Sequence, residues 1–262
     1  MRTTAIMNLK GGTAKTITAI NTAAILSKVH GHKVLLVDAD SQGNLSEFTA
    51  ANPTALPMAK GTSSLLRGDV AGPIPTKMRD VLLIHGDEDL MELDVSAARS
   101  GIANPMAIRD LLDNYAVDDL FDNVIIDCPP AFSASAMAAL AAADEVVIPV
   151  KLDAFGISGL SRIVSQVRNM RKVNPDLEIA GVLPTMFVVG SDAHRKALYQ
   201  LQEVLEALGI RCFHQIRYSR PVDSSTFQQE ALVYSSPKCG ACRDYKIFVR
   251  DLIGEEDDRY GV

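Results

Sequence analysis

One stretch of the sequence decides the fold: Met7-Asn8-Leu9-Lys10-Gly11-Gly12-Thr13-Ala14-Lys15-Thr16-Ile17. It follows an apolar, β-branched run over residues 3–7 and precedes a segment with apolar residues at helical spacing over 18–29. The two adjacent glycines let successive backbone N–H groups point into one cavity, which the positive end of the helix dipole also faces. The stretch therefore predicts a phosphate-binding loop between a strand and a helix.

Within this loop, Lys15 is expected to reach the β- and γ-phosphates of a nucleotide, and the Thr16 hydroxyl to ligate Mg²⁺. The general pattern G-x-x-x-x-G-K-[ST] fits imperfectly, because Leu9 and Ala14 stand where it has glycines. If position 14 requires a positive φ, alanine there costs on the order of 1 kcal/mol and brings a methyl group near the phosphates. We therefore expect slow turnover.

The run from Lys10 to Thr16 resembles the deviant Walker A motif of the ParA/MinD family of dimeric ATPases, and is most similar to that of the ParA-like (Soj-like) partition ATPases. The resemblance implies ATP and Mg²⁺ as cofactors, and catalytic roles for Lys10 and Lys15. It further implies that Lys10 contacts the nucleotide bound by the other subunit. The expected nucleotide contacts are Lys10, Gly11, Gly12, Thr13, Ala14, Lys15, Thr16 and Ile17.

A second polar segment, Asp38-Ala39-Asp40-Ser41-Gln42-Gly43-Asn44, follows a buried apolar run and resembles the ParA-type Asp-x-Asp-Pro-Gln-Gly-Asn segment, with Ser41 in place of Pro. We expect this strand beside the first one, so that its carboxyl end borders the ligand crevice. Asp40 is the candidate for positioning the attacking water. Asp38 is expected either to help the magnesium shell or to hold the loop. Asx residues at such a junction also form ordinary turns.

A third segment, Phe121–Pro130, is an apolar strand that ends in an acid, which is the Walker B arrangement. Asp127 is expected to bind Mg²⁺ directly or through water, and the following Cys-Pro-Pro resembles the family's switch II. Cys128 is interpreted as a small residue beside the site, since no base lies within a local motif of it. In relatives the end of a later strand encloses the adenine, which makes Thr185 and Met186 candidates for base contact.

The pattern as a whole predicts an α/β fold: a doubly wound, mostly parallel twisted sheet flanked by helices, in one domain over residues 1–262. Residues 50–100 are expected to form a variable excursion, with residues 90–93 as a strand or strand-plus-turn. Residues 211–216 are expected to form a last strand. His194 is interpreted as a surface or capping residue, and 254–262 as an acidic tail.

Composition limits the function classes. The chain has 262 residues, 47% of them apolar, and a net charge of −6, which argues against a generally basic nucleic-acid binder. Residues 151–250, however, hold 14 Lys and Arg against 9 Asp and Glu, so a basic patch is compatible with the sequence, as are scattered solvated charges. Family relatives that bind DNA use basic residues before a late helix, here Arg217 and Arg220.

Cysteine usage and hydropathy bear on the compartment. The four cysteines lack a disulfide-framework spacing and the sequence starts without a signal peptide, so we expect a cytoplasmic protein. No apolar run approaches the roughly 18–20 residues that span a bilayer. Cys239-Gly240-Ala241-Cys242 lacks the second ligand pair of a structural zinc site and falls at the start of the predicted terminal helix.

The resemblance implies a Mg-ATPase that forms an ATP-dependent sandwich dimer and binds DNA nonspecifically on the nucleoid. A ParB-like partner would stimulate its slow hydrolysis, and the work would be partition of a plasmid, chromosome or mobile element. Three alternatives stay open: a positioning ATPase for another cargo, a membrane-bound MinD-type regulator, and a nucleotide-binding scaffold with little or no hydrolysis. The acidic tail disfavours the membrane reading, whereas Ala14 and Ile17 favour the scaffold. The cysteine positions disfavour a nitrogenase-like iron protein.

Overall fold

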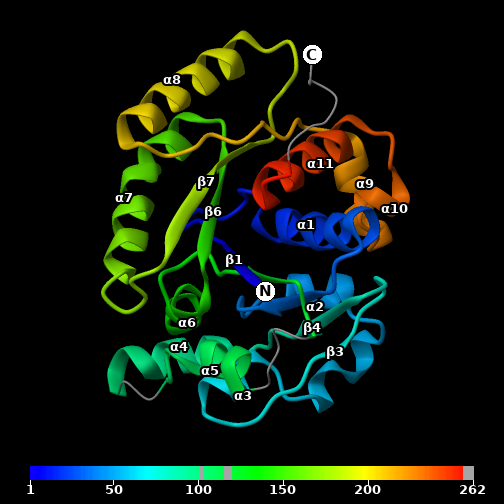
Figure 1. Cartoon of the computed structure of the whole chain (residues 1–262), viewed down its shortest axis with the longest axis vertical. Helices are drawn as coiled ribbons and strands as arrows, with labels where there is room; N and C mark the ends of the chain where they lie inside the picture. The colour runs from blue at the N-terminus through cyan, green and yellow to red at the C-terminus, as the bar shows by residue number, and fades with distance from the viewer. Residues whose placement is uncertain (101–102, 115–119, 256–262) are drawn as a thin grey trace.

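A twisted sheet runs through the molecule (Figure 1). It has seven strands in the order β3-β4-β2-β5-β1-β6-β7. The computed structural model describes residues 1–100, 103–114 and 120–255. Every neighbouring pair of strands is parallel except β3 and β4. The strands are β1 (Arg2–Ile6), β2 (Val34–Asp38), β3 (Ile74–Pro75), β4 (Val81–Ile84), β5 (Asn123–Asp127), β6 (Glu145–Lys151) and β7 (Glu178–Thr185).

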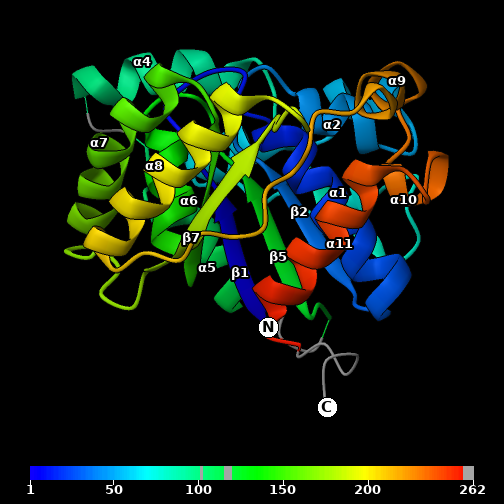
Figure 2. The same cartoon turned by 90° about the horizontal axis from the view of Figure 1, so that it is seen from above.

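Helices cover both faces of the sheet (Figure 1, Figure 2). Because strand side chains alternate, Ala5 and Val37 pack on one face while Ile6 and Leu36 pack on the other. The first face carries α3 (Thr62–Leu66), α4 (Asp89–Ser100), α5 (Ala107–Asn114), α6 (Ala134–Ala142), α7 (Ala154–Met170) and α8 (Asp192–Leu208). The second carries α1 (Lys15–His30), α2 (Asn44–Thr49), η1 (Pro53–Met58), α9 (Arg220–Gln228), α10 (Leu232–Ser235) and α11 (Gly240–Ile253). The predicted doubly wound α/β fold is confirmed.

The three strands that carry the predicted motifs end side by side. Asp127 of β5 is in register with Ile6 of β1 on one side and with Asp38 of β2 on the other. The expectation that β2 lies next to β1 is therefore wrong, because β5 lies between them. Apart from Arg2, every residue of the three strands is buried, so burial alone does not distinguish their order in the sheet.

Two further predictions of secondary structure are wrong. Residues 90–93 lie in α4, where Leu90 and Leu93, three positions apart, share the buried side of a helix. Residues 211–216 lie along β7 but contain only one isolated bridge, at Cys212, and a second follows at Arg217. Phe213 bonds to Val182 and Ile216 to Pro184, so one chain advances three residues while the other advances two, which breaks the ladder.

Other boundaries follow the sequence closely. Gly31 and Gly209 end α1 and α8 with φ values of 72° and 65°, as expected of C-terminal glycines. Ser191 caps α8 by accepting from the His194 N–H, and His194 Nδ1 accepts from the N–H of Val188 in the segment before the helix. The stretch 50–100 supplies β3 and β4 to the sheet. The acidic tail lies, from residue 256 on, outside the described residues. None of the helices in the described part of the chain has the length and hydropathy to span a bilayer.

Candidate nucleotide-binding site

The loop between β1 and α1 has the conformation that its glycines permit. Gly12 has φ 70°, and Ala14, which caps α1, has φ 68° and ψ 30°. Position 14 thus requires the left-handed conformation, in which the alanine Cβ costs on the order of 1 kcal/mol. A Cβ added at Gly11 or Gly12 would meet no described atom within 4 Å, so the space over the loop is open. The loop leaves room for a ligand that binds its backbone N–H groups.

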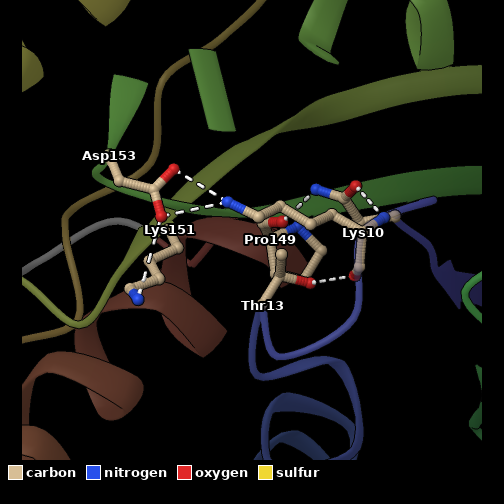
Figure 3. A network of polar contacts seen from close by, with 6 residues as sticks. Lys10, Thr13, Pro149, Lys151 and Asp153 are labelled. Atoms are coloured by element: carbon tan, nitrogen blue, oxygen red, sulfur yellow. Dashed lines mark hydrogen bonds and ion pairs between the residues drawn. The ribbon is translucent and has the colours of Figure 1, made fainter. Parts of the chain in front are cut away.

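Hydrogen bonds within the loop and to β6 and β7 hold its shape. Asn8 Nδ2 donates to the Pro149 carbonyl at 2.7 Å, while Asn8 Oδ1 accepts from the Lys10 N–H at 3.0 Å. The Thr13 hydroxyl donates to the Lys10 carbonyl at 3.3 Å (Figure 3). Thr185 at the end of β7 donates its hydroxyl to the Thr13 carbonyl at 3.2 Å. The contact of Thr185 with adenine stays a prediction, because what the structure shows is its role in fixing the loop.

Lys10 lies at the rim of the loop and is paired within its own chain. Its Nζ lies 2.8 and 3.0 Å from the two carboxylate oxygens of Asp153, just after β6 (Figure 3). Lys151 approaches the same carboxylate at 3.8 Å. The sequence singled out Lys10 but neither Lys151 nor Asp153, since nothing local marks them. In this conformation the Lys10 ammonium is held by Asp153, at the end of β6.

Lys15 lies beneath the loop and is only 7% exposed. Its Nζ donates to the Lys10 carbonyl at 3.4 Å. Burial lowers the pKa of Lys15, and the charges of Asp127 and Asp40 raise it by less. A partly desolvated ammonium beside a phosphate-binding loop provides strong electrostatic stabilisation for phosphate oxygens.

Asp127 is 1% exposed, and neither of its carboxylate oxygens has a hydrogen-bond partner among the described residues. Burial and the charge of Asp38 raise its pKa well above the ordinary value, whereas the Thr16 hydroxyl and Lys15 lower it by less. Unsatisfied buried carboxylate oxygens are rare in folded proteins, and oxygen ligands of this kind are those that Mg²⁺ prefers. The residues present therefore fit a magnesium ion held by Thr16 and Asp127.

Asp38 and Asp40 lie at the end of β2. Asp38 is fully buried, and its carboxylate accepts from the N–H of Asp40 at 3.1 Å and from the N–H of Ser46 at 3.0 Å. Burial raises its pKa to about 6 against these hydrogen bonds. The contacts support the loop-holding alternative for Asp38, and its place in the magnesium shell stays a prediction. Asp40 is partly exposed and close enough to act electrostatically on Lys15 and Asp127.

The two arginines predicted to contact DNA have different surroundings. Arg217 donates from its backbone N–H, Nε and Nη2 to Asp244 of α11, at 2.9, 2.7 and 2.7 Å. Arg220 is exposed at the first residue of α9. Arg217 thus has a structural role that the sequence did not indicate, and Arg220 is the more accessible cation.

Met186, the second candidate for adenine contact, lies just after β7 and has φ 56°.

The Cys-x-x-Cys segment, Cys239 to Cys242, forms the N-terminus of α11. Cys239 Sγ accepts from the Cys242 N–H at 3.3 Å and caps α11, and Cys242 is buried in the core. Cys128, next to Asp127, is also buried, and burial raises the pKa of its thiol. That supports its interpretation as a small residue rather than a nucleophile.

Comparison with known proteins agrees with this geometry. The family model described as AAA domain matches residues 1–179. The chromosome partitioning protein ParA of Caulobacter vibrioides is 30% identical over 268 residues, which cover 99% of this chain and 96% of that protein. This chain belongs to the ParA/MinD family of ATPases. The family predicted from the Lys10–Ile17 loop is thereby confirmed.

A second ParA-like relative is the chromosome-partitioning ATPase Soj of Thermus thermophilus, 34% identical over 188 residues that cover 71% of this chain and 70% of that protein. Among solved structures, a Cyanothece McdA–ATP complex superposes with a TM-score of 0.82 at 27% identity, over 98% of each chain. Cobyrinic acid a,c-diamide synthase of Mycobacterium smegmatis, with an ATP analogue and magnesium, gives 0.81 at 27% identity, over 97% of this chain and 94% of that one. The cofactors of this ParA-like ATPase are ATP and Mg²⁺.

Proposed function

We propose that this ParA-like ATPase forms an ATP-dependent sandwich dimer, binds DNA without sequence preference, and partitions a plasmid, chromosome or mobile element with a ParB-like partner. The observation that carries the proposal is that the two lysines of the loop have different surroundings. Lys15 is buried beneath the loop, while Lys10 stands at the rim and points to Asp153. This difference supports a role for Lys15 at the chain's own nucleotide and a role for Lys10 at the nucleotide of a second subunit.

The Lys10–Asp153 pair is weak enough to exchange. Both side chains are partly exposed, at 37% and 29%, and such pairs are worth about 0–1 kcal/mol. A nucleotide phosphate carries more charge than one carboxylate and accepts charge-assisted hydrogen bonds in several directions. A nucleotide held by a second copy can therefore displace Asp153 from Lys10, which links dimer formation to ATP.

The residues of the site suit hydrolysis by positioning and charge neutralisation. Lys15 stabilises charge on the phosphates, and Asp40 orients the attacking water and accepts its hydrogen bond. Mg²⁺ held by Thr16 and Asp127 would neutralise charge on the phosphate oxygens. The Ala14 methyl group at a left-handed position, which in other P-loops is glycine, supports slow turnover.

Arg220 supports the DNA-binding part of the proposal. It is exposed at the N-terminal end of α9, in the region 151–250 where Lys and Arg outnumber Asp and Glu by 14 to 9. Contacts from such side chains to phosphates give affinity without sequence preference. The protein would then be cytoplasmic, and nucleoid-associated when ATP is bound.

Steady-state ATP hydrolysis tests the proposal, measured with and without nonspecific duplex DNA for wild type and Asp40→Ala, alongside nucleotide binding. Slow turnover that DNA changes and that Asp40→Ala abolishes, with ATP binding retained, is the expected result. Absent nucleotide binding would contradict it.

A second candidate function is a nucleotide-binding scaffold or positioning protein for another cargo, with little or no hydrolysis. The observation that favours it is Ala14, whose left-handed conformation places a methyl group where nucleotide geometry is set. Tight ATP binding without turnover, with duplex DNA and the partner protein both present, would identify this function.

A further inference from the structure

The Ser46 side chain lies where segments from three parts of the site meet. Its hydroxyl donates to Asp38 Oδ2 at 2.7 Å and accepts from the Gly86 backbone N–H at 2.9 Å. The Ser46 backbone N–H donates to the same carboxylate oxygen at 3.0 Å. Ser46 is 1% exposed, so solvent does not compete for these hydrogen bonds. The hydroxyl therefore links the start of α2 to the ends of β2 and β4.

The carboxylate of Asp38, which Ser46 holds in place, in turn fixes the backbone of Asp40. The second carboxylate oxygen of Asp38, Oδ1, accepts from the Asp40 backbone N–H at 3.1 Å. A buried carboxylate with three donors in fixed directions has one orientation, so the backbone at Asp40 is held in one place. Asp40 in turn accepts at its carbonyl from the Gly43 N–H at 3.0 Å, which closes the turn.

Gly86 packs against the same two acids from the other side. A Cβ added there would lie 2.8 Å from Asp38 Cγ and 2.8 Å from the Asp40 carbonyl oxygen. Gly86 is not among the residues with positive φ, so close approach alone requires glycine at this position. The backbone after β4 therefore packs directly against the Asp38 carboxylate and the Asp40 carbonyl and restricts the position of both.

We infer that Ser46 and Gly86 are positioning residues for ATP hydrolysis, because together they hold Asp38 and thereby set the position of Asp40. The inference rests on the proposed function, in which Asp40 orients the attacking water. Misplacing a reacting group by about 1 Å lowers a rate about 100-fold. The phosphate-binding loop, held separately by Asn8 and Thr185, keeps its shape, so nucleotide affinity is retained while kcat falls.

The experiment compares Ser46→Ala and Gly86→Ala with a matched control, Thr49→Ala. Thr49 lies in the same helix and is also 1% exposed, but its hydroxyl donates to the Leu45 carbonyl at 2.8 Å instead of to the site. Measurements are kcat, KM, affinity for a fluorescent ATP analogue, and thermal unfolding. Ser46→Ala and Gly86→Ala should each lower kcat about tenfold or more with affinity changed by less than about twofold. Thr49→Ala should lose thermal stability without that loss of kcat.

A double-mutant cycle distinguishes a positioning role of Ser46 from a purely structural one. In the Asp40→Ala background, Ser46→Ala should cause no further loss of the residual single-turnover rate, because its effect acts through Asp40. Additive losses, or a kcat for Ser46→Ala equal to that of Thr49→Ala, would overturn the inference. If Ser46→Ala does not fold, the same comparison is made with Gly86→Ala.

The outcomes separate the inference from the proposed function. A wild type without turnover, or an Asp40→Ala variant with the wild-type rate, would refute the proposed function and the inference with it. A rate lost in Asp40→Ala but kept in both Ser46→Ala and Gly86→Ala would refute the inference alone.

Discussion

Ala14 has a left-handed backbone, φ 68° and ψ 30°, at the N-cap of α1. Replacing it by glycine should relieve strain of on the order of 1 kcal/mol, part of which is offset by the larger entropy of the unfolded chain. We therefore expect Ala14→Gly to leave the free energy of unfolding equal or higher by up to about 1 kcal/mol, and to speed ATP turnover. Urea unfolding and steady-state hydrolysis measure the two effects.

Ala19→Gly is the matched control, since Ala19 lies in the interior of the same helix. It should lower the free energy of unfolding by about 1 kcal/mol or more, because glycine disfavours a helix interior. Equal destabilisation by the two substitutions would contradict the strain assigned to Ala14.

Arg220 is the exposed arginine of the proposed DNA-binding surface, and its effect can be tested separately from that of Arg217. Arg220→Ala should weaken binding to duplex DNA, reduce the salt dependence of binding by about one phosphate contact, and leave stability unchanged. The measurement is fluorescence anisotropy with ATP at several salt concentrations. Lys60→Ala, an exposed cation in the segment before α3, is the control. DNA affinity equal to wild type for Arg220→Ala would remove Arg220 from the interface.

At the scale of elements, Asp244 ties α11 to the segment that precedes α9. Burial alone would raise the pKa of Asp244, but hydrogen bonds from His214 and Arg217 lower it to about 2. A lowered pKa means stability that is fully present above the ordinary value of 3.8 and is lost as pH falls towards about 2. Arg217→Ala should therefore lower the free energy of unfolding by about 2 kcal/mol near neutral pH, and by less near pH 3.

Urea unfolding of wild type and Arg217→Ala at pH 7 and pH 3 measures this difference. A difference that stays constant between the two pH values would show that the ion pair does not set the stability of this junction. The same instability would confound any DNA-binding test that combines Arg217→Ala with Arg220→Ala.

The start of α11 gives a second prediction for an element. Because Cys239 acts through its side chain as an N-cap, and serine is the better cap, Cys239→Ser should keep or raise the free energy of unfolding by up to about 1 kcal/mol. Cys242→Ser should lower it, since Cys242 is buried in the core. Thermal unfolding with and without added zinc measures both. A zinc-dependent loss of stability on Cys239→Ser would contradict the capping role.

The parts of the fold that sequence predicts are those with local causes. Lys10 to Thr16 and Asp127 were found because phosphate and magnesium chemistry requires these residue types at fixed places, and Gly31 and Gly209 because a helix end does. The prediction of a strand or strand-plus-turn at residues 90–93 fails because so short an apolar run has no clear period. The order of β1, β5 and β2 is a tertiary property that equally buried strands do not reveal.

The same limit applies to the site. Ser46, Gly86 and Asp153 act through partners 8 to 143 positions away in the sequence, so no local pattern marks them. The sequence predicts a DNA contact for Arg217 but not its structural role, because its partner Asp244 lies 27 residues further on. Long-range pairing is what the structure adds to the sequence.

At the scale of the whole molecule, the proposed dimer gives Lys10 a contact with the nucleotide of a second subunit. Lys10→Ala should bind ATP about as well as wild type, because Lys15 remains beneath the loop, but should not form the dimer. Asp153→Asn should favour the dimer, because it weakens the contact that holds Lys10 within its own chain. Sedimentation velocity with Mg-ATP measures both. A Lys10→Ala variant that forms the dimer as readily as wild type would contradict the role of Lys10.

The solution mass of Asp40→Ala, measured with Mg-ATP, with ADP and without nucleotide, shows whether ATP makes this chain a dimer. Asp40→Ala is used because the bound ATP should persist. We expect the monomer mass of 28.2 kDa without nucleotide and with ADP, and twice that mass with Mg-ATP. A single mass in all three conditions, whether monomer or dimer, would contradict it.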